Sequence, residues 1–390
     1  MNIAIVCYPT FGGSGVLATE LGIALADMGH QVHFITYKQP VKLALLSHHV
    51  HFHEVVVPDY PLFRYEPYEL ALSSKLVNVV KDYNIQLLHV HYAIPHAYAG
   101  FMAQQMLAEE GIKIPMVTTL HGTDITLVGN HPFYKPAVTF SINNSDAVTS
   151  VSESLKQDTL THFTIKKPIE VIPNFIDLSK MGAQDGPCER GAMAQPHERI
   201  ITHVSNLRPV KRLMDVVEIF DRIIAECPAR LIIVGDGPDK DPAKALIEQK
   251  GLKSKVQFMG NSDEVHKILC LSDMFLLPSE IESFGLAALE AMACRVPVIS
   301  TNVGGLPEVN LHGYSGYLSD VGDVDSMAQN ALAILKDQAT LNRFKKQARA
   351  QAQNFSIDLV VPQYEALYKR TIEQTLAIKT QNAESGLYQK

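Results

Sequence analysis

Two glutamates in the C-terminal half, Glu282 and Glu290, have a spacing that suggests chemistry. They lie eight residues apart in Ser279-Glu-Ile-Glu-Ser-Phe-Gly-Leu-Ala-Ala-Leu-Glu290, where an apolar helical pattern begins. Eight residues is a little over two helical turns, so both carboxylates are predicted on nearly one face of a helix start. Carboxylates bind hydroxyl groups strongly, and the free N–H groups of a helix start favour a phosphate. The segment therefore predicts a site for a ligand with hydroxyls and phosphate, such as a nucleotide-sugar.

A glycine-rich loop, Tyr8-Pro-Thr-Phe-Gly-Gly-Ser-Gly15, follows the first apolar segment and leads into a helical pattern. Gly12, Gly13 and Gly15 would let backbone amides approach a diphosphate, because no Cβ stands in the way. The spacing fits neither the G-x-G-x-x-G dinucleotide fingerprint nor the G-x-x-x-x-G-K-[ST] loop. The loop is therefore either a phosphate cradle or a tight turn for packing, and both interpretations stay open.

His121-Gly-Thr-Asp124 follows another predicted strand, at the carboxyl edge where open α/β sheets bind ligands. Either His121 contacts a ligand such as a sugar, or Gly122 and Asp124 form a turn around a structural histidine.

A basic cluster, Arg208, Lys211 and Arg212, closes a strand in the second half of this otherwise acidic chain. It could neutralise a leaving diphosphate, the role that other enzymes give to a metal, or it could be a solvated helix start. Val234-Gly-Asp-Gly-Pro238 and Gly304-Gly-Leu-Pro-Glu308 end two further strands in turns. Together with the segment of Glu282, these make four glycine-rich or charged strand ends in one half of the chain, which favours a ligand-binding rim.

Histidines alternate at His49, His51 and His53, and His89 precedes His91 by two residues. The alternation places three histidines on one strand face. Metal binding is one interpretation, but no carboxylate or cysteine completes a ligand set, so a strand face without metal is predicted. A G-x-S-x-G nucleophile motif is also absent from the sequence.

The composition excludes several classes of protein. No apolar run approaches the roughly 20 residues needed to span a bilayer, and a net charge of −7 argues against nucleic-acid binding. The N-terminus lacks the basic region of an export signal, so a cytoplasmic protein is predicted. Five cysteines without Cys-x-x-Cys spacing are predicted to be reduced thiols: Cys7, Cys188, Cys227, Cys270 and Cys294. The sequence leaves open whether the chain forms a homo-oligomer.

The elements that must position these residues follow the rhythm of a parallel sheet covered by helices, and the pattern occurs twice. With 390 residues, two domains are expected. Residues 181–199 are predicted to form an exposed loop near the domain junction, and the chain is expected to cross between the domains near Ile172-Pro-Asn-Phe175. The residues after Asp323 are predicted to be helical, with a frayed tail from Thr380. The predicted strands are 3–7, 31–36, 87–90, 116–119 and 147–151 in the first set, and 200–204, 230–234, 256–259, 274–277 and 296–300 in the second.

In order along almost the whole chain, the motifs resemble those of the GT4 family of retaining glycosyltransferases. They are Gly12-Gly-Ser-Gly15, His121-Gly-Thr-Asp124, Asn206 to Lys211, Gly235-Asp-Gly-Pro238, and Glu282-Ser-Phe-Gly with Glu290. The resemblance implies a GT-B fold of the α/β class, with two Rossmann-like domains facing across a cleft and a C-terminal helix that returns to the first domain. The implied bounds are 1–174 for the acceptor domain, 175–355 for the UDP-sugar domain, and 356–390 for the helix and its tail.

The resemblance also implies residue roles. Glu290 would bind the ribose hydroxyls, Lys211 and the Gly13 amide the diphosphate, and Glu282 with the amides of 283–285 the sugar hydroxyls and phosphate. His121 would lie beside the transferred sugar. The implied catalytic residues are His121, Lys211 and Glu282. The implied donor-binding residues are Gly13, Gly15, Asn206, Arg208, Lys211, Gly235, Glu282, Ser283, Phe284, Gly285, Leu286 and Glu290.

Within the family, the N-terminal phrases resemble those of the members that glycosylate L-malate in bacillithiol synthesis. The phrases are Cys7-Tyr-Pro, His91-Tyr-Ala-Ile-Pro-His96, Thr118-Thr-Leu-His-Gly-Thr-Asp124 and Ile172-Pro-Asn-Phe-Ile-Asp177. This resemblance implies transfer of N-acetylglucosamine from UDP-GlcNAc to the hydroxyl of L-malate, with retention of the α configuration. Ser14, Tyr92 and Thr119 would border the malate pocket.

Two departures from the family pattern matter. Many members have arginine where this chain has Asn206, which leaves Lys211 and Arg208 to carry more of the phosphate charge. The malate-using members place an arginine near Thr139, where this sequence has none. A buried dicarboxylate needs a cation, so Arg64, and after it Lys135, is predicted to supply one.

Retention without a carboxylate nucleophile fits front-face displacement, in which the leaving phosphate oxygen takes the acceptor proton. No essential metal and no cofactor are therefore predicted. Three alternatives stay open: another acceptor, such as an inositol phosphate or a polysaccharide; a UDP-sugar epimerase; and a non-catalytic UDP-sugar-binding module.

Overall fold

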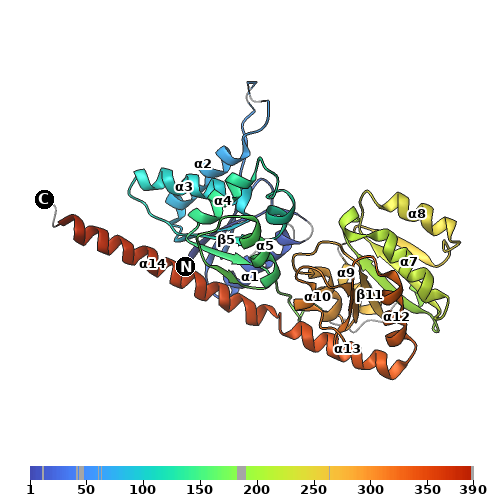
Figure 1. The fold of residues 1–390 in the computed structure, drawn as a ribbon. Helices are drawn as coiled ribbons and strands as arrows, with labels where there is room; N and C mark the ends of the chain where they lie inside the picture. Colours follow the sequence, from blue (N-terminus) through green and yellow to red (C-terminus); the bar gives the residue numbers. More distant parts are fainter. Residues whose placement is uncertain are drawn as a thin grey trace. The chain divides into compact units, whose positions relative to one another are not determined.

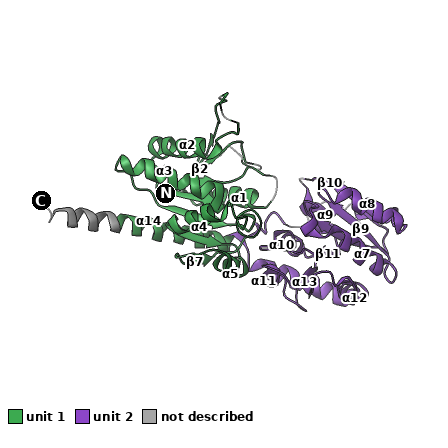
Figure 2. Cartoon of the chain, turned by 45° about the horizontal axis from the view of Figure 1, so that its top comes forward, with its two compact units in different colours: residues 1–174, 358–390 green, residues 175–357 purple. Residues whose placement is uncertain are grey.

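The computed structural model describes residues 1–10, 13–40, 43, 48–59, 61–62, 64–181, 190–262 and 264–387. The chain divides into two compact units, shown in Figure 2. Unit 1 comprises Met1–Asn174 together with Asp358–Lys390, and unit 2 comprises Phe175–Ile357.

Unit 1 is built on a seven-stranded parallel sheet in the order β3-β2-β1-β4-β5-β6-β7. Residues 3–6 of the β1 strand are completely buried, as expected for a central strand covered by helices on both faces. The strands are β1 (Asn2–Val6), β2 (Gln31–Thr36), β3 (Val50–Glu54), β4 (Leu87–His91), β5 (Met116–Leu120), β6 (Ala147–Ser150) and β7 (Ile169–Val171). The helices are α1 (Ser14–Asp27), α2 (Tyr68–Tyr83), α3 (Tyr98–Glu109), α4 (Lys135–Asn144) and α5 (Glu153–His162), with wide π-type turns η1 (Ala93–Ala97) and η2 (Thr123–Leu127).

Unit 2 repeats the architecture with a six-stranded parallel sheet in the order β10-β9-β8-β11-β12-β13. Its strands are β8 (Arg199–Val204), β9 (Ala229–Val234), β10 (Val256–Gly260), β11 (Met274–Leu277), β12 (Val298–Thr301) and β13 (Gly316–Ser319). Its helices are α6 (Arg190–Met193), η3 (Pro209–Lys211), α7 (Leu213–Ile224), α8 (Lys240–Gln249), α9 (Val265–Leu271), α10 (Leu286–Ala293), α11 (Leu306–Val309), α12 (Val324–Leu335) and α13 (Gln338–Gln353). The α7 helix buries one apolar stripe, which includes Val216, Val217 and Phe220, in the core of this unit.

The last helix, α14 (Ile357–Leu387), is labelled in Figure 1, and the unit colours of Figure 2 show that its described part belongs mostly to unit 1. Tyr368 is fully buried there, and its hydroxyl lies 2.6 Å from Nδ1 of His89 on β4. Glu365 contacts His30 at 3.1 Å, and Arg370 contacts Glu170 at 2.8 Å. The helix therefore returns to the first domain, as the family resemblance implied.

These two Rossmann-like domains confirm the GT-B fold class. All ten predicted strands are present, and the sequence reading missed β3, β7 and β13. Residues 182–189 of the predicted junction loop lie outside the described residues, and the short helix α6 follows them. Helix α14 continues to Leu387, past Thr380, where the predicted frayed tail begins.

No helix in the described part of the chain is long and apolar enough to cross a membrane.

Candidate active site

Each sheet has one point where the strand order reverses, and loops at the carboxyl ends of the strands meet there. In unit 1 this point lies between β1 and β4, beside the loops that begin at Tyr8 and Tyr92. In unit 2 it lies between β8 and β11, beside Lys211 and Glu282. The sequence-predicted residues therefore form two groups, and each group is described within its own unit.

In unit 1, the buried carboxylate of Asp124 fixes the two loops that carry His121 and Tyr92. Its Oδ1 accepts hydrogen bonds from the backbone N–H groups of His121 (3.2 Å) and Gly122 (3.0 Å), and its Oδ2 accepts one from Ala93 (2.9 Å). Burial raises the pKa of Asp124, although these bonds favour its charged form. The alternative of a turn held by Asp124 is thus present, and it positions His121 at the same time.

The ring of His121 is held by a second histidine. Its Nε2 lies 2.8 Å from Nδ1 of His91, and the two rings stack. Nε2 of His91 is buried without a hydrogen-bond partner among the described residues, so the proton of His91 is better placed on Nδ1, where it is donated to His121. His121 then carries its own proton on Nδ1. Burial and repulsion from His96 lower the pKa of His121 to about 3, so the ring is neutral at physiological pH.

Ser14 and Tyr92, both predicted at the acceptor, are in contact. Ser14 is the first residue of α1, and its hydroxyl lies 2.5 Å from the Tyr92 hydroxyl. The Tyr92 backbone has φ +82°, an uncommon conformation for a residue other than glycine. Gly13 is the N-cap of α1 and Gly15 its second residue, while Gly12 lies outside the described residues.

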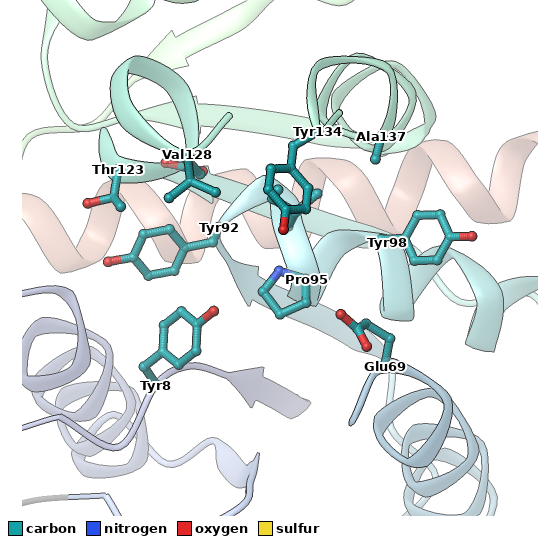
Figure 3. Close-up of a pocket in the computed structure, with 11 residues that line it drawn as sticks. Tyr8, Glu69, Tyr92, Pro95, Tyr98, Thr123, Val128, Tyr134 and Ala137 are labelled. Carbon is teal, nitrogen blue, oxygen red and sulfur yellow. The ribbon is translucent and has the colours of Figure 1, made fainter. Parts of the chain in front are cut away.

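A cavity of about 560 Å³ opens beside Tyr92, and Figure 3 shows its wall. Four tyrosines line it together with two carboxylates, and no lysine or arginine of the described residues does so. A dicarboxylate bound here would therefore need a cation from outside this wall. The lining residues are Tyr8, Glu69, Tyr92, Ile94, Pro95, Tyr98, Thr123, Asp124, Val128, Tyr134 and Ala137.

Three further predicted acceptor residues, Thr119, Lys135 and Arg64, have other contacts. Thr119 is only 1% exposed, and its hydroxyl bonds His89 Nε2 (2.8 Å) and the Thr149 hydroxyl (2.6 Å), so it has a structural role in the sheet. Lys135 lies over the ring of Phe163, and the exposed Arg64 lies over the ring of Tyr65. None of the three lines the cavity beside Tyr92.

In unit 2, Glu282 is held by a glycine turn and not by a helix. Helix α10 begins only at Leu286, after Gly285 in a left-handed conformation, so the prediction that Glu282 and Glu290 share one helix face is wrong. The backbone oxygen of Glu282 accepts a hydrogen bond from Gly305 (3.0 Å), and a Cβ on Gly304 would lie 1.9 Å from that oxygen. Glycine at 304 is thus required for the approach of the two loops.

The predicted pair of Lys211 and Glu282 is in direct contact. Nζ of Lys211 lies 2.5 Å from Oε2 of Glu282, and both side chains are mostly buried. Arg212 instead contacts Asp215 (2.7 Å) and Glu280 (3.7 Å). A diphosphate that binds Lys211 must therefore share its ammonium group with Glu282 or displace that carboxylate.

The remaining predicted donor residues belong to the same unit as this pair. Glu290 lies at the fifth position of α10, Phe284 is buried against Phe355, and Ser283 and Leu286 flank the helix start, which has no acidic residue in its first turn. Gly235 packs against the backbone of Ser205, while Asn206 and Arg208 are exposed beside it. The N-terminus of α10 therefore remains suited to an anion.

Several residues that line the unit 1 cavity were not predicted as site residues from the sequence, notably Tyr8, Glu69 and Tyr134. Tyr8 could have been found, because it follows the first strand at the carboxyl edge. Glu69 and Tyr134 come from α2 and the start of α4, and no local pattern marks them.

Across the described residues, no group of three or more histidine, cysteine, aspartate or glutamate side chains is arranged to hold a metal ion. The ring of His33 on β2 stacks against the rings of His51 and His53 on β3, as a packed strand face.

Two Rossmann-like parallel sheets with polar strand ends at their switch points define the architecture of the GT-B class. Residues 11–180 match the family described as Glycosyltransferase Family 4, and residues 191–351 match Glycosyl transferases group 1. The chain is 44% identical over 370 residues to the N-acetyl-alpha-D-glucosaminyl L-malate synthase of Bacillus anthracis, covering 94% of this chain and 96% of that protein. The chain therefore belongs to the family 4 glycosyltransferases.

More distant relatives agree with this assignment. The GPI3 subunit of the phosphatidylinositol N-acetylglucosaminyltransferase of Saccharomyces cerevisiae is 27% identical, over 87% of this chain and 76% of its own length. The crystal structure of Anabaena Alr3699/HepE in complex with UDP and glucose matches with a TM-score of 0.80 at 20% identity, covering 95% of this chain and 99% of that one. At that identity, the structural match shows the fold alone.

Proposed function

We propose that this glycosyltransferase moves N-acetylglucosamine from UDP-GlcNAc to the hydroxyl of L-malate and releases UDP, the first step of bacillithiol synthesis. The observation that carries the proposal is the 44% identity, over nearly both full lengths, to a relative named for this reaction. Residues of both proposed binding surfaces lie at the two switch points of the fold. A cytoplasmic location is part of the proposal.

Donor recognition is proposed to depend on unit 2. Glu290 would bind the ribose hydroxyls, because a carboxylate accepts two charge-assisted hydrogen bonds from neighbouring hydroxyls. The diphosphate would bind at the N-terminus of α10 and take Lys211 from its contact with Glu282. Glu282, released from that ion pair, could then accept hydrogen bonds from the sugar hydroxyls. The pair would thus keep both groups ordered before the donor binds.

The chemical step is proposed to be front-face displacement. As the bond from the anomeric carbon to the phosphate oxygen breaks, that oxygen takes the proton of the malate hydroxyl, which attacks from the same face. Lys211 would stabilise the charge on the leaving diphosphate. His121, neutral and fixed by His91, would hold a sugar hydroxyl and orient the reacting carbon.

The malate side is proposed to include the Ser14 and Tyr92 hydroxyls, which lie in contact beside the cavity. A dicarboxylate still needs a cation, and Arg64 is the only arginine in residues 1–174. Arg64 is therefore kept as the proposed partner of malate, with Lys135 second.

The decisive experiment measures UDP release from UDP-GlcNAc with and without L-malate. We expect release only with malate, and one glycosylated malate per UDP. Release of UDP with an inositol phosphate or a polysaccharide, but not with malate, would show that the acceptor is not malate. Conversion of UDP-GlcNAc without any acceptor would indicate an epimerase. Binding of UDP-GlcNAc without release of UDP under any condition would indicate a non-catalytic binding module.

A parallel arm removes divalent metals. Front-face displacement supported by Lys211 predicts that EDTA leaves turnover unchanged. Loss of turnover with EDTA and its recovery with Mg²⁺ would contradict this part of the proposal.

A further inference from the structure

Two thiols of unit 2, Cys270 and Cys294, are in contact. Cys270 lies near the end of α9, and Cys294 caps the C-terminus of α10, the helix that carries Glu290. The two side chains form a hydrogen bond with each other, and Sγ of Cys294 also lies 3.6 Å from the carbonyl oxygen of His266. Neither cysteine has a role in the proposed reaction.

The two thiols differ in reactivity. Cys270 is half-buried, and the hydrogen bond from Cys294, together with the nearby Arg349 guanidinium, lowers its pKa to about 7. Cys294 is only 8% exposed, and its contact with Cys270 and its burial raise its pKa. Arg349 is itself fixed by hydrogen bonds to the carbonyl oxygens of Ala293 and Met181. A half-buried thiol with a lowered pKa thus lies beside a buried thiol with a raised pKa, as in a pair of attacking and resolving cysteines.

We propose that Cys270 and Cys294 form an oxidation site that closes to a disulfide with a hydroperoxide and thereby weakens donor binding at α10. The Cys270 thiolate attacks the peroxide, so that an S–O bond forms, the O–O bond breaks, and the leaving oxygen is protonated. The Cys294 sulfur then attacks the sulfenic acid of Cys270. An S–S bond forms, the S–O bond breaks, and water leaves with the Cys294 proton, so that two thiols are oxidised and one peroxide is reduced.

Disulfide formation must move one or both ends of these helices. A disulfide joins its sulfurs at about 2.0 Å, which is shorter than any hydrogen-bonded contact between thiols. Helix α10 is packed tightly, with Ala288, Leu289 and Met292 buried, so a shift of Cys294 reaches Glu290 one helical turn earlier. That Glu290 reads the donor rests on the proposed function, whereas the disulfide itself does not.

The test uses the full chain carrying Cys188→Ser, because Cys188 lies outside the described residues. Residues 268–295 contain no lysine or arginine before Arg295, so trypsin releases both cysteines on one peptide. A second protease that cuts after Glu280, Glu282 and Glu290 separates them unless a disulfide joins them. After treatment with hydrogen peroxide, mass spectrometry is expected to find the linked fragments, and dithiothreitol to release them.

The same oxidised sample is assayed for UDP release. We expect the KM for UDP-GlcNAc to rise about tenfold, the size of one lost charge-assisted hydrogen bond, and dithiothreitol to restore it. Under reducing conditions, the Cys270→Ser and Cys294→Ser variants should release UDP as fast as the unchanged protein, and peroxide should no longer affect them. The matched control Cys227→Ser should stay sensitive to peroxide.

Two outcomes would overturn the proposal. One is the absence of linked fragments after peroxide treatment. The other is an equal peroxide effect in Cys270→Ser, which would assign the effect to another group, such as Met292. If reduced protein fails to release UDP while the linked fragments are found, the proposed function is wrong and the disulfide site stands.

Discussion

At the scale of single residues, the proposed catalytic groups are oriented by contacts within the protein. Asp124 binds three backbone N–H groups of two loops, and His91 binds the ring of His121. In unit 2, Lys211 and Glu282 orient each other. These contacts restrict the reacting groups before a ligand arrives, which lowers the entropy lost on binding.

His91→Phe should lower kcat more than it changes the KM for either substrate. The change removes the bond to Nε2 of His121 but keeps a ring of similar size, and the loss of one buried hydrogen bond is worth about tenfold in rate. Steady-state kinetics measure the split, and ¹⁵N NMR of labelled histidine measures the tautomer of His121. His33→Phe, the same substitution at the far side of the sheet, is the control. An unchanged His121 spectrum in the His91 variant would refute this positioning role.

Arg64→Ala should raise the KM for malate far more than the KM for UDP-GlcNAc. The reason is that a bound dicarboxylate loses its only arginine from residues 1–174. Lys135→Ala serves as the comparison, because Lys135 lies against Phe163. Equal effects of Arg64→Ala on both substrates would exclude Arg64 from the malate site.

At the scale of elements, loops that are distant in sequence support one another. The turn at Gly304 and Gly305 supports Glu282, and Val210 accepts a backbone hydrogen bond from Glu280 at 2.8 Å. The proposed donor surface therefore joins the loops after three strands, β8, β11 and β12.

Gly304→Ala should weaken UDP-GlcNAc binding while leaving the malate KM nearly unchanged. Gly304 has φ +55°, and an added Cβ would collide with the Glu282 oxygen, so the loop must move. Gly313→Ala is the matched control, because Gly313 also has positive φ (+76°) but no atom lies within 4 Å of the added Cβ. Donor KM values compare the two variants, and the same change in both would mean that backbone strain alone is responsible.

The elements could be predicted where burial makes the pattern simple. Central parallel strands such as β1 and β11 are continuous apolar runs, and they were found. Strand β3 was missed because His51 and His53 interrupt its apolar pattern, and their packing against His33 on β2 depends on strand pairing.

The site could be predicted only as separate motifs. Local sequence identified Lys211 and Glu282, but their ion pair joins residues 71 positions apart and depends on the sheet order. Thr119 looked available at a strand end, yet its hydroxyl turns into the sheet toward His89. The spacing of Glu282 and Glu290 predicted one helix face, but the helix begins only after the left-handed Gly285. The sequence carries no clear signal for this late start.

At the scale of the whole molecule, buried neutral histidines in both units should make stability depend on pH. Burial lowers the pKa of His89 to about 3 and of His96 and His203 to about 4, and all three are fully buried. Below pH 6.5 the unfolded chain binds protons at these sites that the folded chain does not. Stability is therefore complete above about pH 6.5 and falls toward pH 4, by up to about 1.4 kcal/mol per histidine per pH unit.

Urea unfolding at pH 7.5 and pH 5.0 measures this dependence before most carboxylates titrate. The urea midpoint should be lower at pH 5.0 than at pH 7.5. His96→Gln should make this difference in midpoint smaller, by the contribution of one buried histidine. A midpoint that does not change between the two pH values would contradict the buried neutral state.

The return of α14 to unit 1 also has a consequence for the order of synthesis. The fully buried Tyr368 and its partner His89 belong to one domain, but the whole of unit 2 is translated between them. A ribosome adding about 5–20 residues per second needs roughly ten to forty seconds for that stretch. During this interval the N-terminal domain lacks its last helix, so the domain made first is the one completed last.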